Sequence, residues 1–339
     1  MKKILMIGTG GTIASKQTEN GLAPGLTPND ILACIPQVKH VCGVETIQVC
    51  NIDSTNVTPE HWKLMVEAVE KHYDAYDGFV ICHGTDTLAY TAAALSYMIQ
   101  NSPKPIVVTG AQKPINMDVT DAKTNLLDSF IYAADDDSED VSIVFDGKVI
   151  IGTRAKKERA KSYNAFSSIN FPYPAVIQDG QVIRYIPPVR HKGEVRFYHD
   201  MKDSVYVLKL VPGMRSGVLT QILEQYDCVV IESFGVGGLP DSITAEVYEG
   251  MKKWKKEGKL IVMTTQVVSE GSNMTVYEVG KKVKQDFDLL EAYDMTLEAT
   301  ITKLMWLMAQ PAKDYEEIKK RFYRMINHDI LFAGFREDK

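Results

Sequence analysis

The stretch Lys3-Ile4-Leu5-Met6-Ile7-Gly8-Thr9-Gly10-Gly11-Thr12 decides the fold of this chain. Its first half is typical of a buried β-strand, and its second half is a glycine-rich turn that lets backbone N–H groups approach a ligand. Open α/β sheets bind their ligands at the carboxyl ends of the strands. The stretch therefore predicts an α/β fold in which the Thr12 hydroxyl lies at a binding site.

Further β-branched runs alternate with helix-forming segments as far as residue 185. The expected strands are 44–50, 79–82, 105–109, 141–145 and 148–152, and the expected helices are 59–73, 88–99 and 122–134. Thr58 and Pro59 suit the N-cap and the first position of the first of these helices. Because the strands are apolar throughout, we expect a mostly parallel sheet flanked by helices on both faces.

The alternation is interrupted once and then resumes. Residues 187–204 carry prolines, a glycine and many charges, which is typical of an exposed connection. Strands at 205–211, 228–233 and 260–264 follow, with a helix after Pro240 and two C-terminal helices. We therefore expect two α/β domains: an N-terminal domain at 1–186, a linker at 187–204 and a smaller C-terminal domain at 205–339.

Composition excludes several classes of protein. The net charge is −6, so no general attraction to nucleic acid or to anionic membranes is expected. The apolar runs are much shorter than the roughly 20 residues that cross a bilayer, and the first run breaks at Gly8, too early for a signal peptide. The five cysteines have no disulfide or zinc spacing, and the seven histidines have no metal-binding spacing. These features favour a cytoplasmic protein that acts on a small molecule without a metal.

The glycine-rich turn does not fit a nucleotide site. A dinucleotide fingerprint that begins at Gly8 needs glycine at position 13, which is Ile13, and no Gly-Lys-Ser/Thr follows for a Walker A loop. What remains is a threonine hydroxyl at a strand end, and a hydroxyl that merely caps the next turn is the alternative. Thr12 is internal, so a mechanism that uses a free N-terminal amine is excluded.

A second cluster, His83-Gly84-Thr85-Asp86-Thr87, follows the strand at 79–82. We expect Asp86 in the first turn of the next helix, where the helix dipole keeps its carboxylate ionised and able to receive a substrate ammonium group. Thr85 adds a second hydroxyl to the same crevice. The alternative is a simple helix cap, and His83 is more typical of a packed histidine than of a ligand.

Two further segments carry chemistry. Asp53 and Ser54 close the second strand, although such residues are also common in turns. Lys157 follows the strand at 148–152. Most lysines are solvated, but a lysine buried beside a threonine and an aspartate becomes a proton acceptor if its pKa falls.

Taken together, Thr9–Ala14 and His83–Thr87 resemble the two signatures of the bacterial-type L-asparaginase family. The resemblance continues through Asp53-Ser54, 108–112, the Lys157 segment and 234–237, and so covers nearly the whole chain. Without a secretion signal, the chain is most similar to the cytoplasmic, type I branch. The resemblance implies hydrolysis of L-asparagine to L-aspartate and ammonia, with no metal or organic cofactor.

The resemblance also assigns roles to residues. It implies that Thr12 is the nucleophile, that an acyl-enzyme forms, and that Thr85, Asp86 and Lys157 make a second catalytic set. The substrate-binding residues that it implies are Gly11, Asp53, Ser54, Thr85, Asp86 and Ala111. It further implies a homodimer or homotetramer in which a partner subunit completes each site, and Asn273 and Glu298 are the candidates for that contribution.

One departure and three rival functions stay open. Family members often carry a tyrosine in the segment after the first motif, but residues 19–25 contain none, and Leu22 stands in its place. Activation of Thr12 would then come from a water, from the Thr85, Asp86 and Lys157 set, or from Tyr163. The rivals are a glutamine-preferring hydrolase, the amidase subunit of a tRNA-dependent amidotransferase, which usually has an additional N-terminal domain, and a non-catalytic amino-acid sensor.

Overall fold

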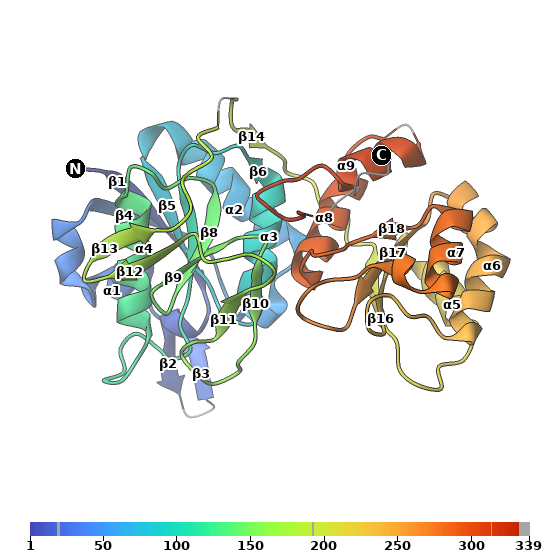
Figure 1. The fold of residues 1–339 in the computed structure, drawn as a ribbon. Coiled ribbons are helices and arrows are strands. Elements are labelled where there is room, and N and C mark those ends of the chain that lie inside the picture. The colour runs from blue at the N-terminus through green and yellow to red at the C-terminus, as the bar shows by residue number, and fades with distance from the viewer. Residues whose placement is uncertain (19–20, 192, 313, 332–339) are drawn as a thin grey trace. The chain divides into compact units, whose positions relative to one another are not determined.

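The computed structural model describes residues 1–18, 21–191, 193–312 and 314–331. The chain divides into two compact units, Met1–Asp200 and Met201–Lys339, and each is an α/β domain (Figure 1). This confirms the fold class expected from the sequence. Residues 187–200, expected in the linker, group with the first unit, where β14 (Arg196–Phe197) pairs with β6 (Ile99–Gln100). No helix in the described part of the chain is long and apolar enough to span a bilayer.

An eight-stranded sheet organises the described part of the N-terminal unit, in the order β13-β12-β9-β8-β7-β5-β1-β4. The strands are β1 (Lys3–Gly10), β4 (Gly43–Ile52), β5 (Gly78–Cys82), β7 (Ile106–Thr109), β8 (Val141–Phe145), β9 (Lys148–Ile151), β12 (Ala175–Gln178) and β13 (Gln181–Arg184). Five neighbouring strands run parallel, namely β4, β1, β5, β7 and β8. The other three, β9, β12 and β13, pair in antiparallel fashion. The β12–β13 hairpin was not expected, because its strands are partly exposed and lack a continuous apolar run.

Helices cover both faces of this sheet. They are α1 (Pro28–Ala33) and α4 (Ala122–Ala134) on one face, and α2 (Pro59–His72) and α3 (Leu88–Met98) on the other. Ile4 and Val80 share a core with Phe130 of α4, while the alternate residue Phe79 stacks on Tyr73 beside α2. Thr58 and Pro59 start α2 as expected. Burial on both faces explains why these strands are apolar throughout.

Short elements extend the N-terminal unit toward the candidate site. The hairpin β2 (Ser15–Thr18) and β3 (Gly21–Pro24) follows the 3₁₀ turn η1 (Thr12–Ala14), and β10 (Ala155–Lys157) pairs with β11 (Phe166–Ser168). The remaining short turns are η2 (Pro36–His40), η3 (Ser54–Asn56) and η4 (Tyr73–Ala75). Four candidate residues, Thr12, Asp53, Ser54 and Lys157, lie in or directly beside these short elements.

The C-terminal unit is built on a parallel sheet in the order β15-β16-β17-β18. Its elements are β15 (Val205–Lys209), α5 (Val218–Gln225), β16 (Cys228–Ser233), α6 (Asp241–Lys256), β17 (Leu260–Thr265), η5 (Met274–Val276), α7 (Glu278–Phe287), β18 (Leu290–Glu291), α8 (Leu297–Ala309) and α9 (Tyr315–Phe322). Helix α6 follows Pro240 as expected. Elements α5, α7 and β18 were not expected, because they are short: α5 and α7 bury three residues each, and β18 has only two residues.

A buried ion pair anchors the end of the described C-terminal unit. Lys303 of α8 lies 2.5 Å from Asp329, and neither side chain is exposed. Lys303 also donates a hydrogen bond to the Arg324 carbonyl, and the other carboxylate oxygen of Asp329 accepts one from the Ile326 N–H. The segment after α9 is thereby fastened to α8.

Candidate active site

Two glycines bring the two sequence motifs together. Strands β1 and β5 are parallel neighbours, so the turns that follow them emerge side by side. Gly11 has φ 76°, and a Cβ atom there would lie 2.4 Å from the Gly84 backbone. A Cβ atom at Gly84 would lie 2.5 Å from the Ser54 Oγ. Only glycine at both positions permits this approach. The turn before Thr12 therefore contacts the turn before Thr85 at Gly84, and Gly84 contacts Ser54.

Hydrogen bonds between the strand ends hold these turns in place. The Thr9 hydroxyl donates to the Cys82 carbonyl at 2.9 Å, and the Gly11 N–H donates to the Ile52 carbonyl at 2.9 Å. The Thr87 hydroxyl donates to the Ser54 carbonyl at 2.8 Å. Each bond joins two segments that are far apart in the sequence, which makes the carboxyl edge of β4, β1 and β5 a rigid frame.

Thr12 lies in the half-buried turn η1, anchored by the buried side chains of Ile13 and Ala14. Among the described residues, no hydrogen bond to the Thr12 hydroxyl is found and no side chain caps η1. The alternative of a capping hydroxyl therefore does not describe Thr12. Its hydroxyl is available to a ligand.

Thr85, Asp86 and Lys157 form a connected set. The Lys157 Nζ donates to the Thr85 Oγ1 at 2.9 Å and to the Asp86 Oδ1 at 2.6 Å. The Lys157 side chain is 18% exposed, whereas that of Asp86 is 57% exposed. A lysine from β10 thus reaches the turn after β5, where one of its partners stays open to solvent and to ligands.

Asp86 does not lie in the first turn of the helix, and that part of the expectation was wrong. Helix α3 begins at Leu88 with Thr87 at its N-cap, and its first turn contains no acidic residue. Asp86 precedes the cap and so lies outside the helix. Its carboxylate is held in position by the ion pair with Lys157.

His83 is a packed histidine. It is fully buried, and burial lowers its pKa from 6.5 to about 4. Its Nδ1–H faces the Gly84 carbonyl at 2.7 Å, and its Nε2 faces the Thr91 hydroxyl at 3.0 Å, which in turn accepts from the Trp62 indole N–H. These partners require the neutral Nδ1–H tautomer. His83 therefore supports the backbone at Gly84 instead of acting on a ligand.

The turn after β7 places the backbone of Ala111, whose side chain is fully buried. The Gln112 and Lys113 N–H groups donate to the Asp121 carboxylate, and the Asn125 side chain donates to the Gly110 carbonyl. Asp121 and Asn125 were not foreseen from the sequence. The sequence offers only their positions as a signal: Asp121 lies immediately before the predicted helix at 122–134, and Asn125 lies one turn into it.

Asp53 and Ser54 have different surroundings. Asp53 is exposed, and its carboxylate accepts two hydrogen bonds from Thr55, one from the N–H and one from the hydroxyl, both at 2.9 Å. Ser54 is buried against Gly84. In this structure Asp53 therefore acts as a turn former, while Ser54 belongs to the contact between the motifs.

The segment after the first motif forms the β2–β3 hairpin, whose base is fixed where the Gly25 and Leu26 N–H groups donate to the Ala14 carbonyl. Glu19, Asn20 and the side chain of Leu22 lie outside the described residues. The Tyr163 hydroxyl donates to the Val119 carbonyl at 3.4 Å. No hydrogen bond links it to Thr12 in the part of the chain that the structure describes.

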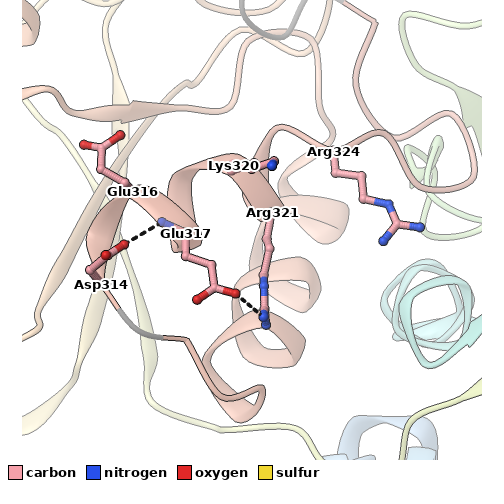
Figure 2. A pocket seen from close by; sticks show the side chains of 6 residues that line it. All are labelled: Asp314, Glu316, Glu317, Lys320, Arg321 and Arg324. Carbon is pink, nitrogen blue, oxygen red and sulfur yellow. Dashed lines mark hydrogen bonds and ion pairs between the residues drawn. The ribbon is translucent and has the colours of Figure 1, made fainter.

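A charged pocket of about 670 Å³ lies elsewhere, in the C-terminal unit (Figure 2). Its lining residues are Asp314, Glu316, Glu317, Lys320, Arg321 and Arg324. Glu317 is bonded through its N–H to Asp314 and through its carboxylate to Arg321. The lining contains no hydroxyl or thiol, so this pocket does not supply a threonine, serine or cysteine nucleophile. No group of three metal-binding side chains is found among the described residues.

Two protein-family models match this chain. The family model "Asparaginase, N-terminal" matches residues 3–190, and "Glutaminase/Asparaginase C-terminal domain" matches residues 204–322. The L-asparaginase of Thermococcus kodakarensis is 39% identical over 335 residues, covering 97% of this chain and 99% of that protein. The solved structure of the thermostable L-asparaginase from that organism has a TM-score of 0.88 at 38% identity, covering 97% and 99%.

Two further relatives carry different names. L-asparaginase 1 of Escherichia coli is 34% identical over 339 residues, covering 97% of this chain and 98% of that protein. A component of the glutamyl-tRNA(Gln) amidotransferase of Methanosphaera stadtmanae is 32% identical over 326 residues, covering 91% of this chain and 72% of that protein. Both family models match, and these relatives are 32–39% identical over more than nine tenths of the chain. The protein therefore belongs to the asparaginase family of amidohydrolases.

Proposed function

We propose that this protein hydrolyses L-asparagine to L-aspartate and ammonia through a threonine nucleophile. The observation that carries the proposal is the Gly11–Gly84 approach, which brings the turn of Thr12 against the turn of Thr85. Two hydroxyl-bearing turns at one sheet edge, with Lys157 bonded to one of them, suit the two halves of an acyl-transfer reaction.

In the proposed first step, the Thr12 oxygen attacks the carbon of the side-chain amide. An ester bond forms, the C–N bond breaks, and nitrogen leaves as ammonia after it takes up a proton. Water then attacks the ester: its oxygen enters the second carboxyl group of aspartate, one of its protons goes to the Thr12 oxygen as the ester bond breaks, and the carboxyl proton passes to ammonia or to solvent. Backbone N–H groups directed at the developing oxyanion contribute roughly 3–4 kcal/mol in such reactions. The Gly10-Gly11 turn has no side chains to obstruct such donors.

The second set of residues acts on a proton in this scheme. The positive charge of Lys157, 2.9 Å from the Thr85 oxygen, lowers the cost of deprotonating Thr85 or a water that Thr85 holds. The group that activates Thr12 has three candidates: a water, the Thr85, Asp86 and Lys157 set, or Tyr163 after it leaves Val119.

The substrate is a zwitterion, and the proposed subsites match its charges. The exposed carboxylate of Asp86 receives the α-ammonium group, and Ser54 with the backbone near Gly11 donates to the α-carboxylate. Asp53 joins this subsite only if it releases Thr55. The Ala111 carbonyl receives the leaving amide nitrogen. We propose no metal or organic cofactor.

A homodimer or homotetramer with sites near the subunit interface is part of the proposal. Of the two candidate contributors, Asn273 is exposed in the turn before η5, whereas Glu298 is buried in the first turn of α8. Asn273 is therefore the better placed to reach a partner. We also propose a cytoplasmic location, since all five cysteines are free thiols and three of them are buried.

The proposal is tested by ammonia release from L-asparagine, L-glutamine and D-asparagine. We expect turnover of L-asparagine by the wild type and a loss of about 10⁴-fold or more in kcat for Thr12→Ala. Thr46→Ala is the matched control and should keep the wild-type rate, because the Thr46 hydroxyl on β4 donates to Asn29 and, among the described residues, has no hydrogen bond to the candidate site.

Each other outcome has a stated meaning. Preferential turnover of L-glutamine would favour the glutamine-specific hydrolase or the amidotransferase component, a function suggested by the names of some relatives. Binding of amino acids without ammonia release by the wild type would favour the sensor. Full activity in Thr12→Ala would remove Thr12 as the nucleophile.

A further inference from the structure

Gln112 connects the Thr85 hydroxyl to the loop that follows Lys157. Its Oε1 lies 3.0 Å from the Thr85 Oγ1. Its Nε2 donates to two carbonyls of that loop, those of Arg159 at 3.3 Å and Ser162 at 3.2 Å. The backbone of Gln112 is itself fixed, because its N–H donates to both oxygens of the Asp121 carboxylate.

These partners determine which end of the amide faces Thr85. A carbonyl oxygen accepts hydrogen bonds and cannot donate them, so both carbonyls require the NH₂ end of the side chain. If the amide were rotated by 180°, its oxygen would face two other oxygens. The amide oxygen must therefore face Thr85.

The direction of the Thr85 O–H bond follows. An ammonium group has donors only, so Lys157 donates to a lone pair of the Thr85 oxygen. The Gln112 oxygen is an acceptor only, so the single Thr85 proton points to it. In this state the proton is held away from Lys157, and a lone pair of Thr85 faces the lysine.

We propose that Gln112 is a positioning residue for the amidohydrolase reaction: it fixes the direction of the Thr85 hydroxyl and the loop that follows Lys157. Without Gln112, the Thr85 hydroxyl can rotate its proton toward other acceptors. The Arg159–Ser162 loop also loses its two hydrogen bonds to the turn after β7. The inference rests on the proposed function. The expected loss is in the chemical step, since Gln112 contacts Thr85 and the loop rather than the proposed subsites for the α-groups.

The test uses two variants of similar shape on the full-length chain. Gln112→Met removes both polar ends, and we expect kcat for L-asparagine to fall by about 10- to 100-fold while KM changes by less than about threefold. Gln112→Glu keeps an acceptor for Thr85 but, when ionised, directs an oxygen at two carbonyls. When protonated, it keeps an oxygen that accepts from Thr85 and gains one O–H donor for the loop carbonyls, where the amide has two N–H donors.

The pH dependence separates positioning from a merely structural role. We expect the ratio of kcat for Gln112→Glu to kcat for the wild type to rise as the pH falls from about 8 to 5, as the glutamate gains its proton. The same ratio for Gln112→Met should stay flat. Gln181→Met, an exposed glutamine on β13, should match the wild type throughout.

Two results would overturn the inference alone: wild-type kcat in Gln112→Met, or equal losses in both variants at every pH. Either can occur while the wild type hydrolyses asparagine and Thr12→Ala does not, which leaves the proposed function intact. A wild type without amidase activity would instead overturn both proposals.

Discussion

Two lysine–aspartate pairs, one in each unit, have nearly equal lengths and opposite surroundings. Lys157–Asp86 measures 2.6 Å and Lys303–Asp329 measures 2.5 Å. Asp86 is 57% exposed and Lys157 shares its ammonium with a hydroxyl, whereas Lys303 and Asp329 are entirely buried. The ion pair is chemically the same, and its surroundings determine what it can do.

The difference is one of solvation. Burial lowers the pKa of Lys303, and Asp329 opposes that shift. Both groups of the buried pair have already lost their water, so breaking the pair leaves an uncompensated charge in the interior. The pair at the strand ends loses little when broken, because Asp86 remains hydrated. We therefore expect the first pair to matter for turnover and the second for stability.

Lys157→Met should produce the largest effect. Removing the charge beside Thr85 should lower kcat for L-asparagine by several hundredfold or more, within the roughly 10²- to 10⁴-fold typical of acid–base groups. The free energy of unfolding, measured with urea, should change by less than about 1 kcal/mol. A variant with wild-type kinetics, or with a large loss of stability, would contradict the contrast between the two pairs.

Lys303→Met should have the converse effect. It leaves Asp329 buried without its cation, and we expect a loss of about 3–5 kcal/mol in the free energy of unfolding. The folded fraction should keep its kcat within about threefold. The double variant Lys303→Met/Asp329→Asn removes both charges while retaining an acceptor for the Ile326 N–H, and it should recover most of the stability. A double variant no more stable than the single one would count against the charge explanation.

His83 tests what burial does to a group without an ion-pair partner. Its pKa, lowered to about 4 in the fold, is 6.5 when solvated, so the unfolded chain binds the proton first as the pH falls. The stability that this shift in pKa contributes is therefore fully present above pH 6.5. As the pH falls toward 4, the free energy of unfolding loses this contribution, about 3 kcal/mol in total. Unfolding free energies measured from about pH 7.5 to 4.5 should fall less steeply in His83→Gln than in the wild type. Equal slopes would show that the fold does not lower the His83 pKa.

Lys148–Asp146 completes the series at the surface and should have the smallest effect. Both side chains are about one third exposed at a 2.8 Å separation. Lys148→Ala should change the free energy of unfolding by less than about 1 kcal/mol and leave kcat unchanged. A loss comparable to that of Lys303→Met would mean that exposure does not rank these pairs.

Much of the N-terminal unit was predictable because its pattern is local. The strand at 79–82 is apolar throughout, that at 141–145 is apolar except for Ser142, and Thr58-Pro59 marks a helix start within two residues. The C-terminal unit was less predictable, since α7 is a short, highly polar helix that buries only three of its ten residues. The motif residues were named from their positions after predicted strands, and their roles from a resemblance, but their contacts were not derivable from spacing.

The sequence alone determined the alternation of the main strands and helices, the glycine-rich turns and the family resemblance, because each depends on residues close together along the chain. The tertiary structure decided which side chains meet and which lose their water. Lys157 reaches Thr85 from 72 residues away, and Gln112 reaches Thr85 from 27. Contacts over such separations depend on the packing of the whole sheet, so no local pattern contains them.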